Sequence, residues 1–110
     1  MARTGRQAIE SLTVLEMEVM DIAWELNKMS IREVHERISK KKYLPYTTIS
    51  AVMRNLAKKG VLRQSRDGKV FIYKVMADRH ALARIIIDSV VKKLLRGDMT
   101  PLAAYLAEKK

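Results

Sequence analysis

The sequence predicts a mainly α-helical fold with a small β-hairpin, a winged helix-turn-helix followed by C-terminal dimerisation helices. Apolar residues recur at helical spacing in three segments before residue 60. Two β-type runs with a turn signal between them follow, and two more helical segments complete the chain. A length of 110 residues supports one compact core with an appended element. We therefore expect a flexible basic N-terminal arm at residues 1–10, a winged helix at 11–76 and a C-terminal helical region at 77–110.

The first two helices have the same start signal. Thr13 and Glu16 form a capping box, and Ser30 and Glu33 repeat the same spacing. Apolar residues then follow at helical spacing. In the first helix they are Leu15, Val19, Ile22 and Leu26, and in the second they are Ile31, Val34 and Ile38. The first helix should end before Asn27, and the second near residue 40.

A third helix and a hairpin complete the predicted domain. Pro45 suits a first helical turn, and Gly60 is a strong stop signal. The apolar positions between them are Ile49, Val52, Met53 and Leu56. The runs VLRQSR and KVFIYKV then alternate as strands do, and Asp67 with Gly68 between them suits a type I′ turn.

The C-terminal region carries an apolar stripe that is too wide for one intrachain contact. A fourth helix should run from Asp78 to about Arg96, with Gly97 as its stop, and Thr100 with Pro101 should begin a last short helix. The stripe and its continuation comprise Ala83, Ile86, Ile87, Val90, Val91, Leu94, Leu95, Leu102, Tyr105 and Leu106. One alternative is a helix folded back onto its own domain. We favour a homodimer interface, because a surface helix needs only about 100° of apolar arc.

The positive charge is concentrated in one segment. The chain has 22 Lys and Arg against 12 Asp and Glu, a formal net charge of +10. Residues 28–74 hold thirteen basic and three acidic residues, so this segment alone carries the whole excess. A polyanion would be attracted to it. Five acidic and no basic residues lie between Glu10 and Glu25, so the first helix should face away from that segment.

The outer face of the third helix has small hydroxyl side chains and basic ones. At 100° per residue, Thr47, Ser50, Ala51, Arg54 and Lys58 lie opposite the apolar positions. Short side chains let the helix approach DNA closely, and Thr, Ser, Asn and Arg can bond base edges in the major groove. The alternative is a solvated face that lacks acids. The basic segment and the adjacent hairpin favour a recognition helix.

The candidate DNA-binding residues have different expected roles. The Thr, Ser, Asn and Arg side chains of the third helix are expected to read bases. Basic side chains in and around the helix are expected to contact phosphates, and these are Arg32, Lys40, Lys41, Lys42, Lys58 and Lys59. Arg66 and Lys69 flank the wing tip, where a solvated role is equally open. Tyr43 and Tyr46 either contact the DNA backbone or cover the core edge. The full set is Arg32, Lys41, Lys42, Tyr46, Thr47, Thr48, Ser50, Ala51, Arg54, Asn55, Lys58, Arg66 and Lys69.

Other classes of function are disfavoured by composition. The chain has no cysteine, and its two histidines, His35 and His80, lie on different predicted helices, so we expect neither catalysis nor a metal site. We also expect no cofactor and no small-molecule effector. No apolar run approaches the roughly 20 residues of a membrane span, and residues 1–10 lack a secretory h-region. These features predict a cytoplasmic protein.

Several motifs together resemble a known family. The runs LTVLEMEVMDIAW, SIREVHERI and YTTISAVMRNLAKKG and the hairpin ending in IYKV are similar, in order and spacing, to the penicillinase-repressor family, the BlaI/MecI/CopY-like winged-helix transcriptional regulators. The resemblance covers about residues 11–107. It implies a homodimeric repressor with its winged helix on operator DNA and its C-terminal helices in the dimer. The cysteine cluster of the copper-responsive branch and the Asn-Phe bond that is cut in the antibiotic-resistance branch are both absent here.

We therefore predict a dimeric, sequence-specific transcriptional regulator, most readily a repressor, whose partners are a palindromic double-stranded DNA operator and a second copy of the chain. The alternative is a winged-helix protein-interaction or polymerase-accessory module whose basic face is incidental. RNA binding is a weaker third reading. A DNA-binding protein should lose affinity steeply with salt, whereas a protein-docking module should bind little DNA at any salt.

Overall fold

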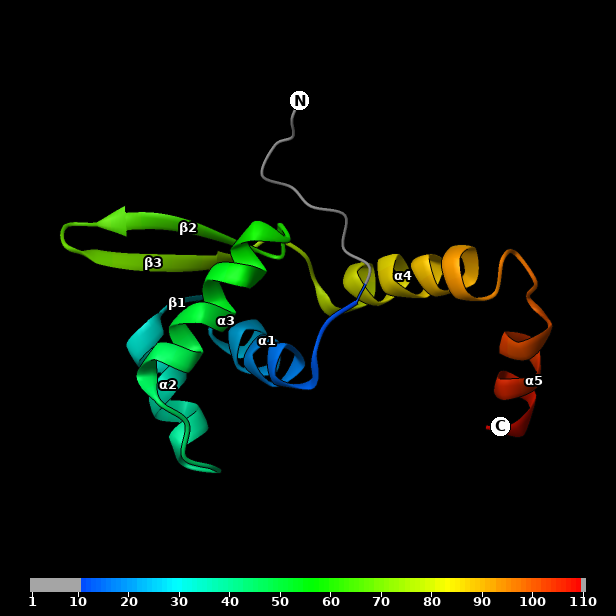
Figure 1. Cartoon of the computed structure of the whole chain (residues 1–110). Coiled ribbons are helices and arrows are strands. Elements are labelled where there is room, and N and C mark those ends of the chain that lie inside the picture. The colour runs from blue at the N-terminus through cyan, green and yellow to red at the C-terminus, as the bar shows by residue number, and fades with distance from the viewer. Residues whose placement is uncertain (1–10, 110) are drawn as a thin grey trace.

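A computed structural model describes residues 11–109 of the chain, and Figure 1 shows a helical domain with a projecting hairpin and a C-terminal arm. The predicted N-terminal arm at residues 1–10 lies outside the described residues. The elements are α1 (Val14–Leu26), β1 (Lys28–Ser30), α2 (Ile31–Ser39), α3 (Tyr46–Lys58), β2 (Leu62–Asp67), β3 (Val70–Val75), α4 (Arg79–Ser89), the π-helical turn η1 (Val90–Leu94) and α5 (Thr100–Glu108).

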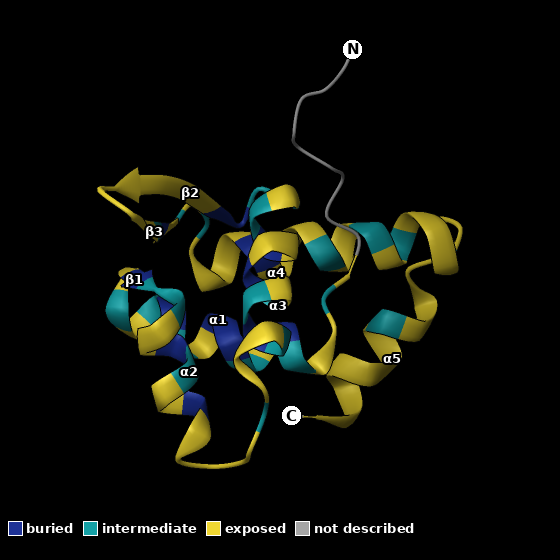
Figure 2. Cartoon of the chain, turned by 60° about the vertical axis from the view of Figure 1, so that its left-hand side comes forward, coloured by how far each residue is buried: buried dark blue, intermediate teal, exposed yellow. Residues whose placement is uncertain are grey.

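Helices α1, α2 and α3 and the sheet enclose one apolar core. Figure 2 shows the buried positions gathered where these elements meet. The core comprises Val19, Met20, Ala23, Met29, Val34, Ile38, Ile49, Met53, Leu56, Val61, Leu62, Tyr73 and Leu82. Three helices and a hairpin around this core confirm the predicted winged-helix class.

The sheet has three antiparallel strands in the order β1-β3-β2, one more than predicted. Strand β1 has only three residues, and Met29 is its single buried side chain. One apolar residue cannot establish the period-two alternation by which a strand is recognised in a sequence. Pairing with β3 places Met29 opposite Tyr73 and so adds both side chains to the core.

Both predicted capping boxes are present. The Thr13 hydroxyl accepts the Glu16 N–H at 3.0 Å, and the Glu16 carboxylate accepts the Thr13 N–H at 2.8 Å. Ser30 and Glu33 make the same reciprocal pair at the start of α2. Satisfying these N–H groups fixes where each helix begins.

The hairpin turn lies one residue later than predicted. Asp67 pairs with Val70, so the two linking residues are Gly68 and Lys69. Gly68 has φ +66°, and the only non-glycine residues with positive φ in residues 11–109 are Asn27 and Arg96. A positive φ at the first linking position alone is the pattern of a type II′ turn, which corrects the type I′ expectation.

The C-terminal arm consists of α4, η1 and α5, and the base of this arm is attached to α1. The indole of Trp24 donates to the Ala77 carbonyl at 2.9 Å, and the guanidinium of Arg79 lies 4.4 Å from the Trp24 ring centroid. Arg79 also pairs with Asp21 at 3.0 Å, and Leu82 is buried in the core. Beyond this base, Figure 1 shows α4 and α5 extending away from the domain.

The predicted fourth helix is not a regular α-helix throughout. After Ser89 the chain continues as η1, and the Leu95 N–H donates to the Val90 carbonyl at 3.0 Å, an i to i+5 bond. Arg96 and Gly97 then have φ of 55° and 85°, which confirms the predicted stop. Asp98 accepts the Thr100 N–H at 3.0 Å, and hydrogen bonds from the Thr100 backbone and side chain lower the pKa of this exposed carboxyl.

Candidate nucleic-acid interface

Helix α3 is held from beneath and exposed above. Its buried residues Ile49, Met53 and Leu56 lie in the core against α1, α2 and β2. Its start, at Pro45, has no side-chain cap, unlike the starts of α1, α2 and α4. The first N–H groups of α3 are therefore left without a side-chain acceptor, and this helix end suits an anion such as a phosphate.

No predicted DNA-binding residue is buried. Thr48 and Ser50 are half-buried, and the other eleven are exposed: Arg32, Lys41, Lys42, Tyr46, Thr47, Ala51, Arg54, Asn55, Lys58, Arg66 and Lys69. The Arg54 guanidinium donates to the Ser50 hydroxyl at 3.0 Å across one turn of α3. This contact holds the long Arg54 side chain along the outer face, where it can meet a base edge with little further loss of rotamer entropy.

A histidine supports the loop before α3. His35 Nε2 lies 2.8 Å from the Leu44 carbonyl, and its ring meets that of Tyr46 edge-on at 5.6 Å. The contact ties the connection at residues 40–45 to α2 and orients the first residue of α3. From the sequence, His35 is a candidate only for catalysis or metal binding, and its positioning role cannot be predicted, because nothing in the local sequence signals a contact nine residues away.

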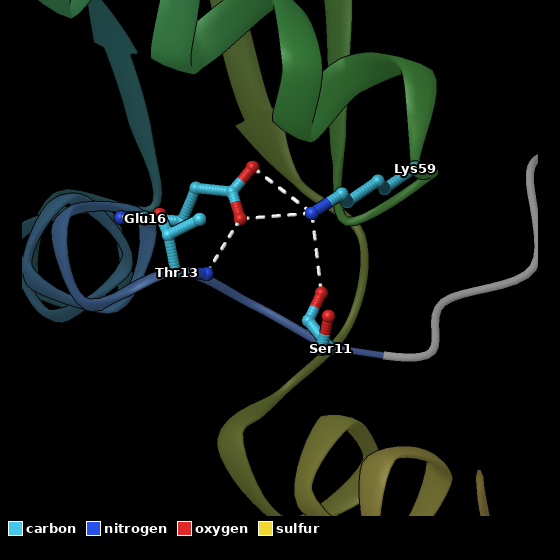
Figure 3. A network of polar contacts seen from close by, with 4 residues as sticks. All are labelled: Ser11, Thr13, Glu16 and Lys59. Carbon is cyan, nitrogen blue, oxygen red and sulfur yellow. Dashed lines mark hydrogen bonds and ion pairs between the residues drawn. The ribbon is translucent and has the colours of Figure 1, made fainter. Parts of the chain in front are cut away.

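The C-terminal end of α3 is tied to the start of α1. Figure 3 shows the Lys59 ammonium reaching the Glu16 carboxylate, at 2.8 Å and 3.1 Å from its two oxygens, and the Ser11 carbonyl at 3.1 Å. Lys59 was expected to contact phosphate. The structure instead pairs its ammonium with the nearly buried Glu16 carboxylate, so a phosphate contact would have to displace an internal ion pair.

The acidic face of α1 does not turn away from the basic segment as predicted. Glu18 pairs with Lys42 at 2.9 Å, and Glu25 pairs with Arg37 at 2.8 Å. These acids therefore pair with one cation near the end of α2 and one in the loop after it. A phosphate would have to compete with Glu18 for Lys42, whereas Lys41 has no ion pair within residues 11–109.

A groove runs between the second half of α3 and the start of β2. It has a volume of about 770 Å³, and its lining includes three cationic side chains, Arg54, Lys58 and Arg63. Arg63 was not among the predicted DNA-binding residues, because it lies in a strand run outside the recognition-helix pattern. The fold brings it into the same groove as Arg54 and Lys58, beside the outer face of α3.

The wing itself carries two of the predicted cations. The Arg66 guanidinium lies 5.2 Å from the Phe71 ring centroid on the neighbouring strand, a cation–π contact that holds Arg66 along the hairpin. Lys69 occupies the tip of the wing, within the two-residue turn. Together these residues extend the positive surface beyond α3.

The predicted dimer residues lie on the arm and are largely uncovered. None of the ten is buried. Ile86, Val91, Leu95 and Leu102 are half-buried, and the exposed members are Ala83, Ile87, Val90, Leu94, Tyr105 and Leu106. Ile86 packs against the chain's own core, as does Leu82, so the first turns of α4 face inward. The remaining apolar side chains of α4, η1 and α5 have no such cover.

Neither a metal site nor a membrane-spanning helix is found in the described part of the chain. Residues 11–109 contain no cluster of three or more His, Asp or Glu side chains suited to a metal ion. None of the helices there has the length and apolarity needed to cross a bilayer.

A recognition-type helix beside a basic hairpin, both on a three-helix core, defines a winged-helix DNA-binding domain. A family model described as Penicillinase repressor matches residues 12–110. The chain belongs to the penicillinase repressor family, a family of transcriptional repressors, which are not enzymes.

Relatives and solved structures agree with this assignment. The transcriptional regulator BlaI of Mycobacterium tuberculosis is 31% identical over 97 residues, covering 86% of this chain and 70% of the relative. The penicillinase repressor of Bacillus licheniformis is 25% identical over 100 residues, covering 91% of this chain and 78% of the relative.

The solution structure of the DNA-binding domain of the repressor BlaI matches with a TM-score of 0.60 at 30% identity, over 67% of this chain and 89% of that one. The monomeric form of Bacillus licheniformis BlaI in complex with the blaP half-operator matches with a TM-score of 0.56 at 30% identity, over 66% and 89%.

Proposed function

We propose that this protein represses transcription by binding a palindromic DNA operator as a homodimer, with α3 in the major groove and the β2–β3 wing on the adjacent backbone. The observation that carries the proposal is the outer face of α3. Thr47, Ala51 and Arg54 are exposed there, while the opposite face is locked into the core. A rigid helix with a low, cationic outer surface fits the major groove.

The exposed residues divide into base-reading and phosphate-contacting groups. Thr47, Thr48, Ser50 and Ala51 in the first half of α3, with Arg54 and Asn55 in its second half, are assigned to base edges. Basic side chains around the helix supply affinity without sequence information. These are Arg32, Lys41, Lys42, Lys58 and Arg63, with Tyr46 beside them and Arg66 and Lys69 on the wing.

The homodimer is supported by the apolar surface of the arm. A soluble chain seldom leaves Ile87, Leu94 and Leu106 exposed together without a partner. The relative bound to the blaP half-operator is a monomeric form, so one winged helix suffices for one half-site in that protein. Two copies joined through the arm would present two α3 helices to two half-sites. We place the protein in the cytoplasm, where the chromosomes of its bacterial relatives lie.

Selection of bound duplexes from a random pool tests the proposal. The full chain should enrich a two-fold symmetric motif whose half-sites are about one helical turn apart, or a multiple of it. Binding to the enriched duplex should weaken steeply as salt rises. Failure to enrich any motif, together with weak and salt-insensitive binding, would favour a protein-docking module instead.

A further inference from the structure

Three cationic side chains form a row across the outer face of the sheet. Strand β3 lies between the other two strands, and the register pairs Lys74 with Lys28 of β1 on one side and with Arg63 of β2 on the other. All three are exposed. The next residues along the strands, Met29, Tyr73 and Gln64, form the neighbouring row on the opposite face of the sheet: Met29 and Tyr73 are buried, and the amide of Gln64, which is exposed at the edge, donates to the Tyr73 hydroxyl at 2.6 Å. Alternation along each strand therefore directs Lys28, Lys74 and Arg63 away from the core.

This arrangement is unfavourable for the isolated protein. Directly opposed residues of adjacent strands have Cβ atoms about 5 Å apart, and like charges at this spacing repel. No ion pair of Lys28, Lys74 or Arg63 is found within residues 11–109, although many other basic residues there, such as Lys42 and Arg37, have acidic partners. An anion on the outer face would offset the repulsion between all three side chains at once.

The row is continuous with the interface already described. Arg63 also lines the groove beside α3, together with Arg54 and Lys58. Positive charge therefore extends from α3, past the edge strand β2, and across the sheet to β1 over about 10 Å, two strand spacings. A straight row of evenly spaced cations that begins at a DNA-binding groove matches a sugar-phosphate backbone better than the irregular carboxylates of a protein surface.

We propose that Lys28, Lys74 and Arg63 bind the phosphate backbone of DNA that flanks the half-site occupied by α3. The inference rests on the proposed function and adds to it a second, sequence-independent contact surface. Through this surface the protein covers more DNA than the recognition helix and wing tip alone would cover. The flanking contact raises affinity and the salt dependence of binding, and leaves the choice of bases to α3.

Duplex length separates the two contact surfaces. The motif recovered by selection is placed in a short duplex with about two flanking base pairs on each side and in a long one with about ten, roughly a helical turn. Fluorescence anisotropy across a salt series gives the affinity for each. The wild-type chain should bind the long duplex more tightly and with a steeper slope of log K against log salt.

Charge-removing variants then locate the effect. Because each change removes one phosphate contact in each subunit of the dimer, Lys74→Gln should lower the slope on the long duplex by about 2 and reduce the length-dependent gain. The Lys28→Gln/Lys74→Gln double variant should lower the slope by about 4 and remove most of the gain. Neither should alter binding to the short duplex. Lys74→Arg should retain wild-type behaviour. Lys92→Gln is the matched control for net charge, because Lys92 is an exposed cation on η1, away from the sheet.

The variants should fold, since Lys74→Gln removes a repulsion and no core contact, and a melting curve verifies this. An identical slope for Lys74→Gln and wild type on the long duplex would overturn the inference, as would an equal loss for Lys92→Gln. Either result leaves specific binding to the short duplex intact. If the wild-type chain bound neither the short nor the long duplex, the proposed function would be overturned, and this inference with it.

Discussion

At the scale of single residues, one carboxylate links two distant parts of the fold. Glu16 is only 4% exposed, and its oxygens accept both the Thr13 N–H and the Lys59 ammonium. A buried carboxylate is costly unless it is both paired and hydrogen-bonded, and Glu16 meets both conditions. The pair fixes the C-terminal end of α3 against α1 and so contributes to the angle at which α3 is presented.

Replacing this carboxylate by an amide tests its contribution. Glu16→Gln keeps an oxygen for the Thr13 N–H but removes the charge that faces Lys59, so the free energy of unfolding should fall by about 1 to 3 kcal/mol. Glu18→Gln is the matched control: its pair with Lys42 is exposed, and its loss should cost less than about 1 kcal/mol. Urea denaturation measures both, and equal costs would contradict a structural role for the Glu16–Lys59 pair.

The sequence predicted half of this contact. The spacing of Thr13 and Glu16 identified the capping box, because both partners are local. The second partner, Lys59, is 43 residues away, and a lysine beside a helix stop reads equally well as a phosphate contact. The same limit applies to His35, whose contact with the Leu44 carbonyl depends on the path of the loop. Exposed residues such as Thr47 and Arg54, by contrast, followed from helical periodicity alone.

At the scale of elements, the hairpin depends on one glycine. Gly68 has φ +66° and begins the turn that places Lys69 at the wing tip. A Cβ at this position would meet nothing within 4 Å, so any cost of substitution comes from the backbone conformation and not from a clash. For a non-glycine residue, the positive-φ conformation of this type II′ turn position costs about 1 to 3 kcal/mol.

Gly68→Ala should therefore destabilise the protein by about 1 kcal/mol. Gly68→Asn should cost less, because asparagine is, after glycine, among the residues most often found at the positive-φ positions of type I′ and II′ turns. Thermal unfolding of the two variants supplies the comparison. Equal destabilisation by Ala and Asn would show that something other than the backbone conformation makes glycine necessary there.

The presence of the main helices and strands was easier to predict from the sequence than their exact bounds and geometry. Capping boxes and long apolar patterns located α1, α2 and α3, whereas β1 was missed because three residues carry too little pattern. The turn was predicted one residue too early. Both Asp67-Gly68 and Gly68-Lys69 contain the glycine that a two-residue turn needs, and only the register of the two strands shows which pair forms the turn. The π-helical turn at Val90–Leu94 contains no Pro or Gly, so nothing in its composition separates it from a continuing α-helix.

At the scale of the whole molecule, the chain is more extended than one compact domain. Its radius of gyration is 16.0 Å, whereas a compact chain of this length would have about 13 Å. The difference comes from the arm, where α4 is anchored only at its base. Leu94 is 75% exposed and Tyr105 is 55% exposed on this arm. Such an arrangement is expected of a subunit whose arm is covered by a second copy.

Leu94→Glu tests the dimer. An acid at this position would be buried without a partner in the proposed interface, so the dimer dissociation constant should rise at least about tenfold. Lys92→Gln, an exposed change on the same π-helical turn, should leave it unchanged. Sedimentation equilibrium should give twice the chain mass of 12.6 kDa for the wild type and the control, and a lower mass for Leu94→Glu. A wild-type monomer at all concentrations would contradict the dimer.

The distribution of charge along the chain was predictable from the sequence, whereas its arrangement in space was not. The basic excess in residues 28–74 is a count and needs no fold. How this charge divides into internal pairs and free cations depended on the tertiary structure. Lys42 and Arg37 face acids of α1, whereas Arg54, Lys58 and Arg63 meet in one groove.

The most direct test of the central claim, that the outer face of α3 reads bases, is the specificity profile of Arg54→Ala. Binding free energies are measured for the selected operator and for every single-base substitution of one half-site. Arg54→Ala should cost about 1 to 3 kcal/mol on the operator and abolish discrimination at one or two positions, whereas Lys41→Ala should weaken all duplexes similarly. An equal loss for Arg54→Ala on every duplex, with discrimination intact at all positions, would contradict the claim.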